Sequence, residues 1–397
     1  MKREGTIISF YSFKGGVGRT MSLVNIAVLL ARKHKVLIVD FDLEAPGIDK
    51  FLSTFNTKPG KKKGGLLEIL ENANSQKSIN ANIYKSFTKS VIGSPIRELH
   101  YLGSGDFYTD YSQRVQNFNW QIFFEQNQGG VFLERLREEW KANYDFVFID
   151  SRTGYSDTSG ICTYYLPDIL LLIFSANEQS VSGTLEVAEK ANIARQKLAY
   201  DRMPLTIIPI PARIDKTVEY QEVKKWNRVF IQKFSPFYHN WLPKKLTTER
   251  LLEEISIPYI AYYSFGEKLP VLEDSLTSKE SPAYFYAQIA KILESGFYEL
   301  EKMLNDGITS EALVENVRLN NLINNFKEKL NDRQQAIIRE VYLNKSITNK
   351  WCRETFNIVN DTVNRDLKLL LELGILSRSG KGRSTKYVAG KILREIL

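Results

Sequence analysis

The chain has 397 residues, 43% of them apolar and 25% charged, which is enough for two or three domains with substantial cores. Its two cysteines, Cys162 and Cys352, lie far apart, which excludes a disulfide framework or a cysteine metal cluster and indicates a reducing compartment. The net charge is +8, and residues 331–397 carry 13 Lys and Arg against 7 Asp and Glu, so this basic segment contributes +6 and indicates a polyanionic partner.

Nothing in the sequence predicts a membrane role. The N-terminus passes from charged residues straight into an apolar strand pattern, without the apolar core of a signal peptide. The most apolar run, 164–176, is interrupted by Pro167 and Asp168 and is too short to span a bilayer. The last eight residues are too few for an interfacial helix. We therefore expect a cytoplasmic protein.

Short apolar runs alternate with longer helical patterns up to about residue 295. The runs cover 6–13, 35–42, 98–105, 145–150, 168–175, 205–213 and 257–263. Several are apolar at consecutive positions, as are parallel strands that are covered on both faces. The alternation predicts an α/β domain over residues 1–298, with a doubly wound and mostly parallel sheet.

The first run leads into a glycine-rich loop, KGGVGRT, and then into an amphipathic helical pattern. This order predicts a phosphate-binding loop, because glycines let backbone N–H groups converge on phosphate oxygens and the helix N-terminus adds partial positive charge. The Thr20 hydroxyl is expected to ligate Mg²⁺. The plain alternative is a tight turn between strand and helix. The residues predicted to bind nucleotide are Lys14, Gly15, Gly16, Val17, Gly18, Arg19, Thr20 and Met21.

Carboxylates stand at the ends of two later strands. Asp40 and Asp42 follow the second run, and Asp150 ends the run at 145–150, with Gly154 four residues on. Each of these carboxylates can also be explained as an ordinary helix cap. Their occurrence in this order after a glycine loop favours a nucleotide site instead.

KGGVGRT resembles the deviant Walker A motif, KGGxGK[ST], of the ParA/MinD-type ATPases, which belong to the SIMIBI class of P-loop proteins. The resemblance covers roughly residues 5–295. It implies a P-loop NTPase fold, ATP and Mg²⁺ as cofactors, and a homodimer that forms on ATP binding. In this family the lysine matched by Lys14 reaches across the dimer to the partner's phosphates, which makes Lys14 a catalytic candidate.

Two further segments carry the same resemblance. VLIVDFDLEAPG resembles the family's first switch, in which the residue matched by Asp42 positions the attacking water. YDFVFIDSRTG resembles the Walker B strand and second switch, which implies that Asp150 holds the Mg²⁺ shell and that Gly154 offers its N–H to the γ-phosphate. The metal residues expected from these matches are Thr20, Asp40 and Asp150.

Arg19 stands where the family has lysine. Its guanidinium is permanently charged and can bond phosphate oxygens bidentately, so the binding charge is retained. Its bulk and planarity place that charge differently along the β–γ bridge during hydrolysis. Because the other motif residues all remain, we expect an ATP-binding switch with slow hydrolysis. A non-hydrolysing nucleotide sensor is the alternative.

Recognition of the base is predicted from two later segments. Arg213 and Asp215 follow the run at 205–213, where relatives contact the base, although such a pair can also be a surface salt bridge. Residues 257–274 resemble the family's last strand and base-covering loop. The resemblance favours adenine over guanine.

A helical connector is expected at 299–330, followed by a small domain at 331–397. Its pattern predicts helices near 332–343, 346–356 and 361–374, the second capped by Ser346 or Thr348, and then a hairpin near 375–388. The arrangement resembles a winged helix-turn-helix, with the pattern T-x-x-R-D-L-x-x-L-x-x-x-G-I-L of those that follow Fic or divergent AAA-type regulator modules. A winged helix used to dock protein is the alternative.

If this domain binds DNA, its third helix enters the major groove and its hairpin contacts phosphates or the minor groove. Arg365 can instead pair with Asp366 or another neighbour. The expected DNA contacts are Thr362, Asn364, Arg365, Lys368, Arg378, Lys381, Arg383 and Lys386.

The sequence thus predicts an ATP-dependent dimerising switch that acts on DNA in partition, regulation or defence against mobile DNA, with a protein partner that stimulates hydrolysis. The alternative is a nucleotide-gated signalling or assembly protein, with little or no hydrolysis, whose winged helix docks a protein. A steep salt dependence of DNA affinity favours the first interpretation.

Overall fold

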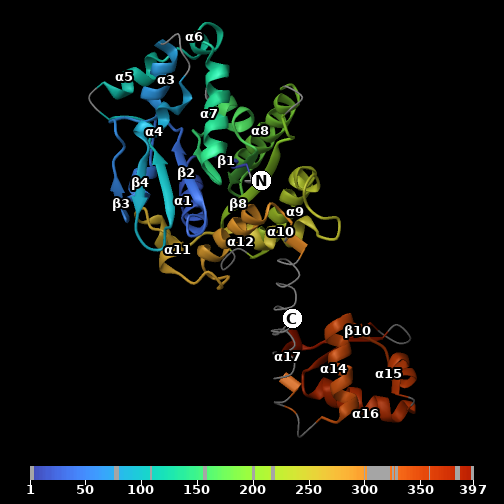
Figure 1. The fold of residues 1–397 in the computed structure, drawn as a ribbon. Coiled ribbons are helices and arrows are strands. Elements are labelled where there is room, and N and C mark those ends of the chain that lie inside the picture. The colour runs from blue at the N-terminus through green and yellow to red at the C-terminus, as the bar shows by residue number, and fades with distance from the viewer. Residues whose placement is uncertain are drawn as a thin grey trace. The chain divides into compact units, whose positions relative to one another are not determined.

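The computed structural model describes residues 4–75, 80–107, 110–154, 159–198, 202–215, 220–298, 300–301, 322–323, 326, 330–356, 358–380 and 385–394. The chain divides into two compact units, Met1–Glu301 and Lys302–Leu397, each with its own fold (Figure 1). Among the described residues, no helix is long and apolar enough to cross a bilayer.

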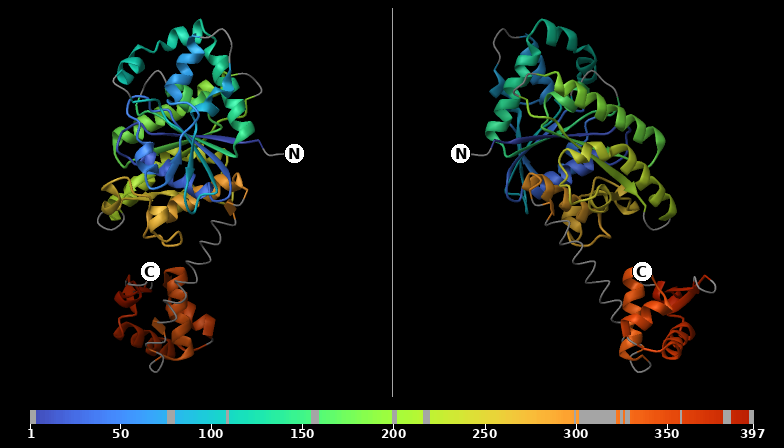
Figure 2. Two further views of the ribbon diagram at one scale, coloured as in Figure 1. Left: turned by 60° about the vertical axis from the view of Figure 1, so that its left-hand side comes forward. Right: turned by 90° about the vertical axis from the view of Figure 1, so that its right-hand side faces the viewer.

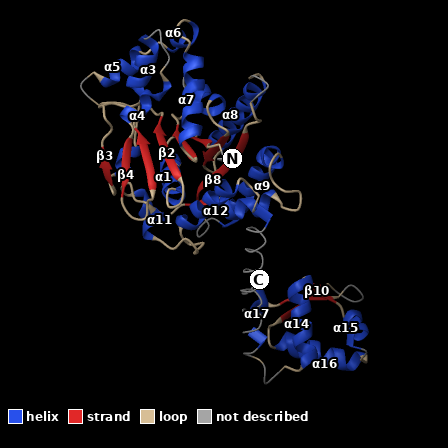
Figure 3. Cartoon of the chain, viewed as in Figure 1, coloured by secondary structure: helices blue, strands red, loops and turns tan. Residues whose placement is uncertain are grey.

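The first unit is built on a nine-stranded sheet with the order β3-β4-β5-β2-β6-β1-β7-β8-β9 (Figure 3). Strands β3 and β4 pair antiparallel at one edge, and the pairs from β5 to β9 are parallel. The sheet therefore has the predicted mostly parallel α/β architecture. Its strands are β1 Thr6–Tyr11, β2 Lys35–Asp40, β3 Asn56–Lys58, β4 Lys89–Ile92, β5 Glu98–Leu102, β6 Phe146–Asp150, β7 Ile169–Phe174, β8 Thr206–Ile214 and β9 Ile257–Pro258.

Helices cover both faces of this sheet (Figure 2). On one face, alternate side chains of the central strands join the core that α3 and α7 complete, as in Leu37, Val39 and Val147. On the other face α1 contacts β2, β6 and α12. The helices of this unit are α1 Arg19–Leu30, α2 Ile48–Leu52, α3 Leu66–Ser75, η1 Ala81–Ile83, α4 Tyr84–Phe87, α5 Tyr111–Asn117, α6 Trp120–Glu125, α7 Gly129–Asn143, η2 Ile161–Tyr165, α8 Glu178–Gln196, α9 Tyr220–His239, α10 Thr248–Ile255, η3 Ala261–Ser264, α11 Pro270–Glu273 and α12 Pro282–Ser295.

Two details of the sheet differ from the sequence prediction. The run at 257–263 is a strand only at β9, because Pro258 has no N–H to extend the ladder. The chain then donates one further bond, from Tyr259 N to Ile214 O at 3.1 Å, and turns into η3. The edge strands β3 and β4 were not predicted, since they are short and β3 is exposed at all three positions.

The second unit contains three longer helices, α14 Asp332–Asn344, α15 Asn349–Phe356 and α16 Asn360–Glu372, and the short α17 Lys391–Arg394. A three-stranded antiparallel sheet accompanies them, in the order β10-β12-β11, formed by β10 Ser346–Ile347, β11 Leu376–Ser379 and β12 Lys386–Ala389. Its core is separate from that of the first unit and includes Val363, Leu367 and Leu370 of α16.

The hydrogen bonds at the start of α15 show which of the two candidates, Ser346 or Thr348, caps this helix. Thr348 is the cap, because its Oγ1 accepts from Trp351 N at 3.1 Å, whereas Ser346 lies in β10. The predicted connector at 299–330 lies mostly outside the described residues. Within that range Leu322 and Ile323 belong to the core of the second unit.

Candidate functional site

A cavity of about 600 Å³ opens beside the carboxyl ends of the central strands of the first unit. In an open parallel sheet this edge is where ligands bind, because the loops that follow the strands meet there. The wall contains every loop residue from Gly15 to Met21, and Asp42. The segment after β2, the start of α2 and the segment around β9 and η3 complete it.

The glycine loop presents an open backbone to this cavity. Gly16 and Gly18 have φ angles of +73° and +89°, which L side chains rarely adopt. A Cβ atom placed on Gly15, Gly16 or Gly18 would meet no atom within 4 Å. Gly18 caps α1, and no side chain bonds the first N–H groups of that helix. These N–H groups are therefore suited to an anion, which a mere tight turn does not require.

Arg19, Thr20, Asp42 and Asp150 form one hydrogen-bonded group. The Thr20 hydroxyl donates to Asp150 Oδ2 at 2.7 Å. The Arg19 guanidinium donates from Nε to Asp150 Oδ1 at 2.6 Å and from Nη2 to Asp42 Oδ2 at 3.1 Å. Burial opposes the charge of Arg19, but the carboxylates of Asp150 and Asp42 outweigh it and raise the pKa of the guanidinium.

Asp40 differs from its neighbours because it lies outside the cavity lining and is completely buried. Burial, with the nearby carboxylates of Asp150 and Asp42, raises its pKa well above the ordinary value and favours the neutral form. Its Oδ1 accepts from Asp42 N at 3.2 Å. Neither Asp40 nor Asp42 caps α2, which begins after Gly47 without a side-chain cap.

Lys14 and Gly154 flank this group and lie outside the cavity lining. Lys14 is half-buried, and no ion pair joins it to another described residue. Gly154 has a φ angle of +69°, and its carbonyl accepts from the Tyr11 hydroxyl at 2.9 Å. The adjoining residue Thr153 does line the cavity.

Of the two residues predicted to recognise the base, Arg213 lines this cavity and Asp215 does not, although both line a second one. Arg213 lines the cavity, donates from Nη1 to Gly16 O at 2.8 Å, and places its guanidinium 4.6 Å from the centre of the Tyr259 ring. Its φ of +58° is unusual for a residue with a side chain. Asp215 lines a second, smaller cavity of about 220 Å³, beside Trp226 of α9.

Several lining residues were not identified from the sequence. Lys50 and Phe51 of α2 reach the cavity, as do Tyr286 of α12 and Ser12 at the end of β1. A lysine or an aromatic residue in a short helix carries no local pattern that marks it as a ligand. Their positions depend on how α2 and α12 pack against the loop.

The predicted DNA contacts of the second unit occupy α16 and the β11–β12 hairpin. Arg365 and Lys368 are exposed, Asn364 is exposed and accepts from Asn349 Nδ2 at 3.0 Å, and Thr362 is half-buried. Arg378 and Lys386 are exposed on β11 and β12, while Lys381 and Arg383 lie outside the described residues.

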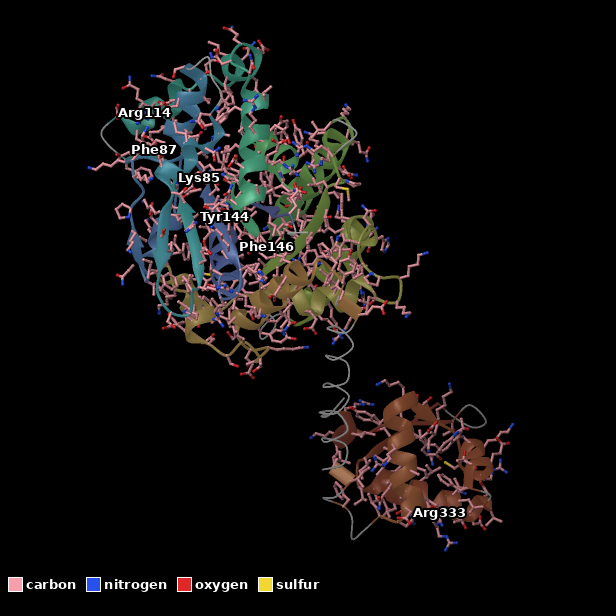
Figure 4. The ribbon with its side chains drawn as sticks, in the orientation of Figure 1. Lys85, Phe87, Arg114, Tyr144, Phe146 and Arg333 are labelled. Carbon is pink, nitrogen blue, oxygen red and sulfur yellow. The ribbon has the colours of Figure 1, made fainter. Side chains whose placement is uncertain are left out.

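Asp366 is occupied by partners other than Arg365. It is buried and accepts from Arg333 Nε at 3.1 Å and Gln334 Nε2 at 2.8 Å, both on α14. Arg333 is labelled in Figure 4. The Arg365 side chain is thus presented on the outer face of α16, beside Lys368.

Comparisons with known proteins match the first unit. Residues 5–198 match a family model described as an AAA domain. An uncharacterised ATP-binding protein of Methanocaldococcus jannaschii is 24% identical over 189 residues, which is 46% of this chain and 59% of that protein. The chain thus spans less than two thirds of this curated relative.

Two solved structures with similar folds are each 16% identical to this chain. The match to a plasmid partition protein of Borrelia burgdorferi covers 74% of this chain and 99% of that protein, with a TM-score of 0.43. The septum site-determining protein MinD of Pyrococcus horikoshii, complexed with Mg-ADP, covers 76% and 98%, with a TM-score of 0.45. The family match covers the segment that contains the glycine loop, Asp42 and Asp150.

Proposed function

We propose that this chain is an ATP-dependent dimerising switch of the ParA/MinD type, which hydrolyses ATP slowly and acts on DNA through its second unit. The observation that carries the proposal is the open glycine loop in a cavity of about 600 Å³, beside the Arg19, Thr20, Asp42 and Asp150 group. The match of residues 5–198 to an AAA domain, and the ATP-binding relative, favour ATP as the ligand.

The cavity lining offers two kinds of chemistry, as a nucleotide requires. At the loop, the N–H groups of α1 are suited to phosphate oxygens, as is Arg19 Nη1, which has no hydrogen-bond partner among the described residues. Elsewhere in the lining, Tyr259 and Tyr263 supply aromatic rings for a base and its ribose, and Arg213, over the Tyr259 ring, supplies a cation. Arg213 is held in place by its bond to Gly16 O.

The Mg²⁺ ion would be held by the Thr20 hydroxyl, with Asp150 binding its shell, and would supply charge neutralisation between the phosphates. Thr20 and Asp150 already lie in hydrogen-bond contact, at 2.7 Å. Among the described residues no three His, Cys, Asp or Glu side chains form a metal site by themselves. This donor set suits a cation that takes its remaining ligands from phosphate and water. Asp40, buried with a raised pKa, would support the shell from behind.

In the proposed cycle Asp42 orients the attacking water, and Lys14 contacts the phosphates bound by a second copy of the chain. The Lys14 ammonium has no ion-pair partner among the described residues, so it is available to an incoming subunit. Gly154, at a φ of +69°, would offer its N–H to the γ-phosphate. Hydrolysis would then separate the two copies, and a protein partner would accelerate it.

Binding to DNA is proposed for α16 and the β11–β12 hairpin, which together form a winged helix in this interpretation. Arg365 and Lys368 are exposed side by side on α16, and Arg378 and Lys386 on the hairpin strands. Two copies held together would double the number of phosphate contacts, and the affinity would rise steeply as salt is lowered.

Phosphate release from the full chain, with and without duplex DNA, tests the proposal. Lys14→Ala and Asp42→Ala should each abolish turnover, whereas Lys33→Ala, at an exposed surface position, should not. Turnover that is unchanged by both substitutions would contradict the assigned site.

A second experiment tests the DNA surface. Arg365→Glu with Lys368→Glu should weaken duplex binding and reduce the slope of log K against log salt by about 2, whereas Lys190→Glu on α8 should not. If the double substitution leaves DNA affinity unchanged while nucleotide binding persists, the second unit docks a protein instead.

A further inference from the structure

Arg19 makes two of its contacts with carboxylates that the proposed function assigns to different tasks. Nε bonds Asp150 at 2.6 Å and Nη2 bonds Asp42 at 3.1 Å. The side chain of Arg19 is 9% exposed, that of Asp150 1% and that of Asp42 7%. Water therefore screens the two ion pairs little. The third nitrogen, Nη1, is buried and has no hydrogen-bond partner in the part of the chain that the structure describes, although Arg19 lines the cavity.

The same contact constrains Asp42. Its Oδ2 accepts from Arg19, and its Oδ1 accepts from Ala45 N at 3.1 Å. Both carboxylate oxygens are thus already bonded to protein donors. A water-orienting residue needs a carboxylate oxygen directed at the water, so Asp42 is poorly prepared for its proposed role while this pair is intact.

A lysine would not reproduce this arrangement. Guanidinium is a planar fork whose nitrogens bond several acceptors at fixed directions, whereas an ammonium group is a compact point charge on a flexible stem. The Arg19 guanidinium bonds Asp150 and Asp42 through two different nitrogens and has a third nitrogen for another acceptor. A lysine has one nitrogen for all of its hydrogen bonds. The difference from the KGGxGK[ST] motif therefore gives this chain a property that its loop would otherwise lack.

We propose that Arg19 is a positioning residue that keeps Asp42 from acting on water until a bound triphosphate takes the guanidinium from it. The proposal rests on the proposed function, because it requires a triphosphate in the cavity. The Arg19–Asp42 pair competes with the ligand, so part of the binding free energy is used to break it. The same exchange couples occupancy of the loop to the readiness of Asp42.

Nucleotide binding by the full chain provides the first test, with a non-hydrolysable ATP analogue as the probe. Asp42→Asn removes the competing carboxylate and should tighten Kd by about fivefold or more. Glu44→Gln is the matched control, since it removes one negative charge from the same segment but from an exposed pair with Arg152. It should change Kd by less than about twofold.

Arg19→Lys tests whether the effect depends on the fork. In that background Asp42→Asn should change Kd by less than about twofold, because no bridge remains to be broken. Arg19→Lys alone should lower the KM for ATP by about fivefold while kcat does not fall in proportion. Equal tightening by Asp42→Asn in both backgrounds, or an effect of Glu44→Gln as large as that of Asp42→Asn, would overturn the proposal.

Thermal melting without added nucleotide tests the bridge independently of any ligand. Arg19→Lys and Asp42→Asn should each lower Tm. The Tm of the double variant should fall by less than the sum of the two single losses, because both substitutions remove the same Arg19–Asp42 pair. Strictly additive losses would show that no bridge exists. If this coupling is found but no variant binds the analogue, the proposed function fails while the bridge stands.

Discussion

At the scale of single residues, Gly18 and Gly47 separate two roles of glycine in the same cavity. Both line it, and a Cβ on either would meet no atom within 4 Å. Only Gly18 has a left-handed φ, at +89°, whereas the φ of Gly47 is −143°, which other residues adopt readily. Gly18 also caps α1, where the phosphate would bind. The left-handed backbone conformation therefore requires glycine at position 18, although there is room for a Cβ atom at both positions.

Gly18→Ala is expected to cost about 1–2 kcal/mol of folding free energy, because an L side chain is strained in the left-handed region. The same substitution should weaken binding of an ATP analogue by about tenfold, since the amides of the loop move out of line. Gly47→Ala should change neither quantity appreciably. Denaturant melts and equilibrium titrations measure the two effects, and equal losses for both variants would contradict this assignment.

At the scale of elements, the buried Asp366 joins α16 to the start of α14. Asn331 and Gln334 form a capping box on α14, and both also donate to Asp366, together with Arg333. Asp361 lies on the same helix but is exposed. The carboxylate of Asp366 thus satisfies the buried amide of Gln334 and joins it to the more exposed Asn331 and Arg333.

Asp366→Ala should destabilise the second unit by about 2–3 kcal/mol, because three donors lose their acceptor. Asp361→Ala should cost less than about 0.5 kcal/mol, as do most exposed substitutions. Hydrogen exchange of α14 and α16 in the full chain reports the difference. Equal protection in the two variants would show that the network does not stabilise the unit.

Stability of the first unit should depend on pH through His100 of β5. Burial and the neighbouring Lys35 lower its pKa, with Glu98 opposing, and its Nδ1 lies 2.9 Å from the Tyr144 hydroxyl. The unfolded chain then binds the proton first, so stability is full above about pH 6.5 and falls as the pH drops toward the folded pKa. His100→Gln, which does not titrate, should flatten the dependence between about pH 7 and 5.

The prediction is checked by denaturant melts of the two proteins at a series of pH values. Parallel curves for the wild type and His100→Gln would contradict it. Tyr144, which is labelled in Figure 4, provides a second check. Tyr144→Phe removes the hydroxyl partner but leaves the half-buried histidine in place, so the pH dependence should persist.

The parts of the fold that were predictable from the sequence are those with a local cause. Consecutive apolar residues predict β2, β6 and β7, and the glycine loop is specified by its own backbone needs. The end of β9 was predicted too late in the chain, because the apolar run continues past Pro258 although that residue has no N–H to extend the ladder. The contact of Arg19 with Asp42 and Asp150 joins residues 23 and 131 positions apart, which no local pattern encodes.

At the scale of the whole molecule, the two units carry different parts of the proposed function. The glycine loop, Asp42 and Asp150 lie in Met1–Glu301, and the exposed basic residues of α16 and the hairpin lie in Lys302–Leu397. In the proposed function, occupancy of the loop influences DNA binding by changing the number of second units that act together. Dimerisation is the step that links the two activities in that proposal.

Sedimentation of the full chain with and without Mg-ATP tests this step most directly, because it detects subunit pairing without depending on turnover. The wild type should sediment as a monomer without nucleotide and as a dimer with it, and Lys14→Ala should remain monomeric in both conditions, whereas Lys33→Ala should behave as the wild type. A wild-type chain that binds ATP yet stays monomeric, or a Lys14→Ala variant that dimerises as the wild type does, would contradict the account.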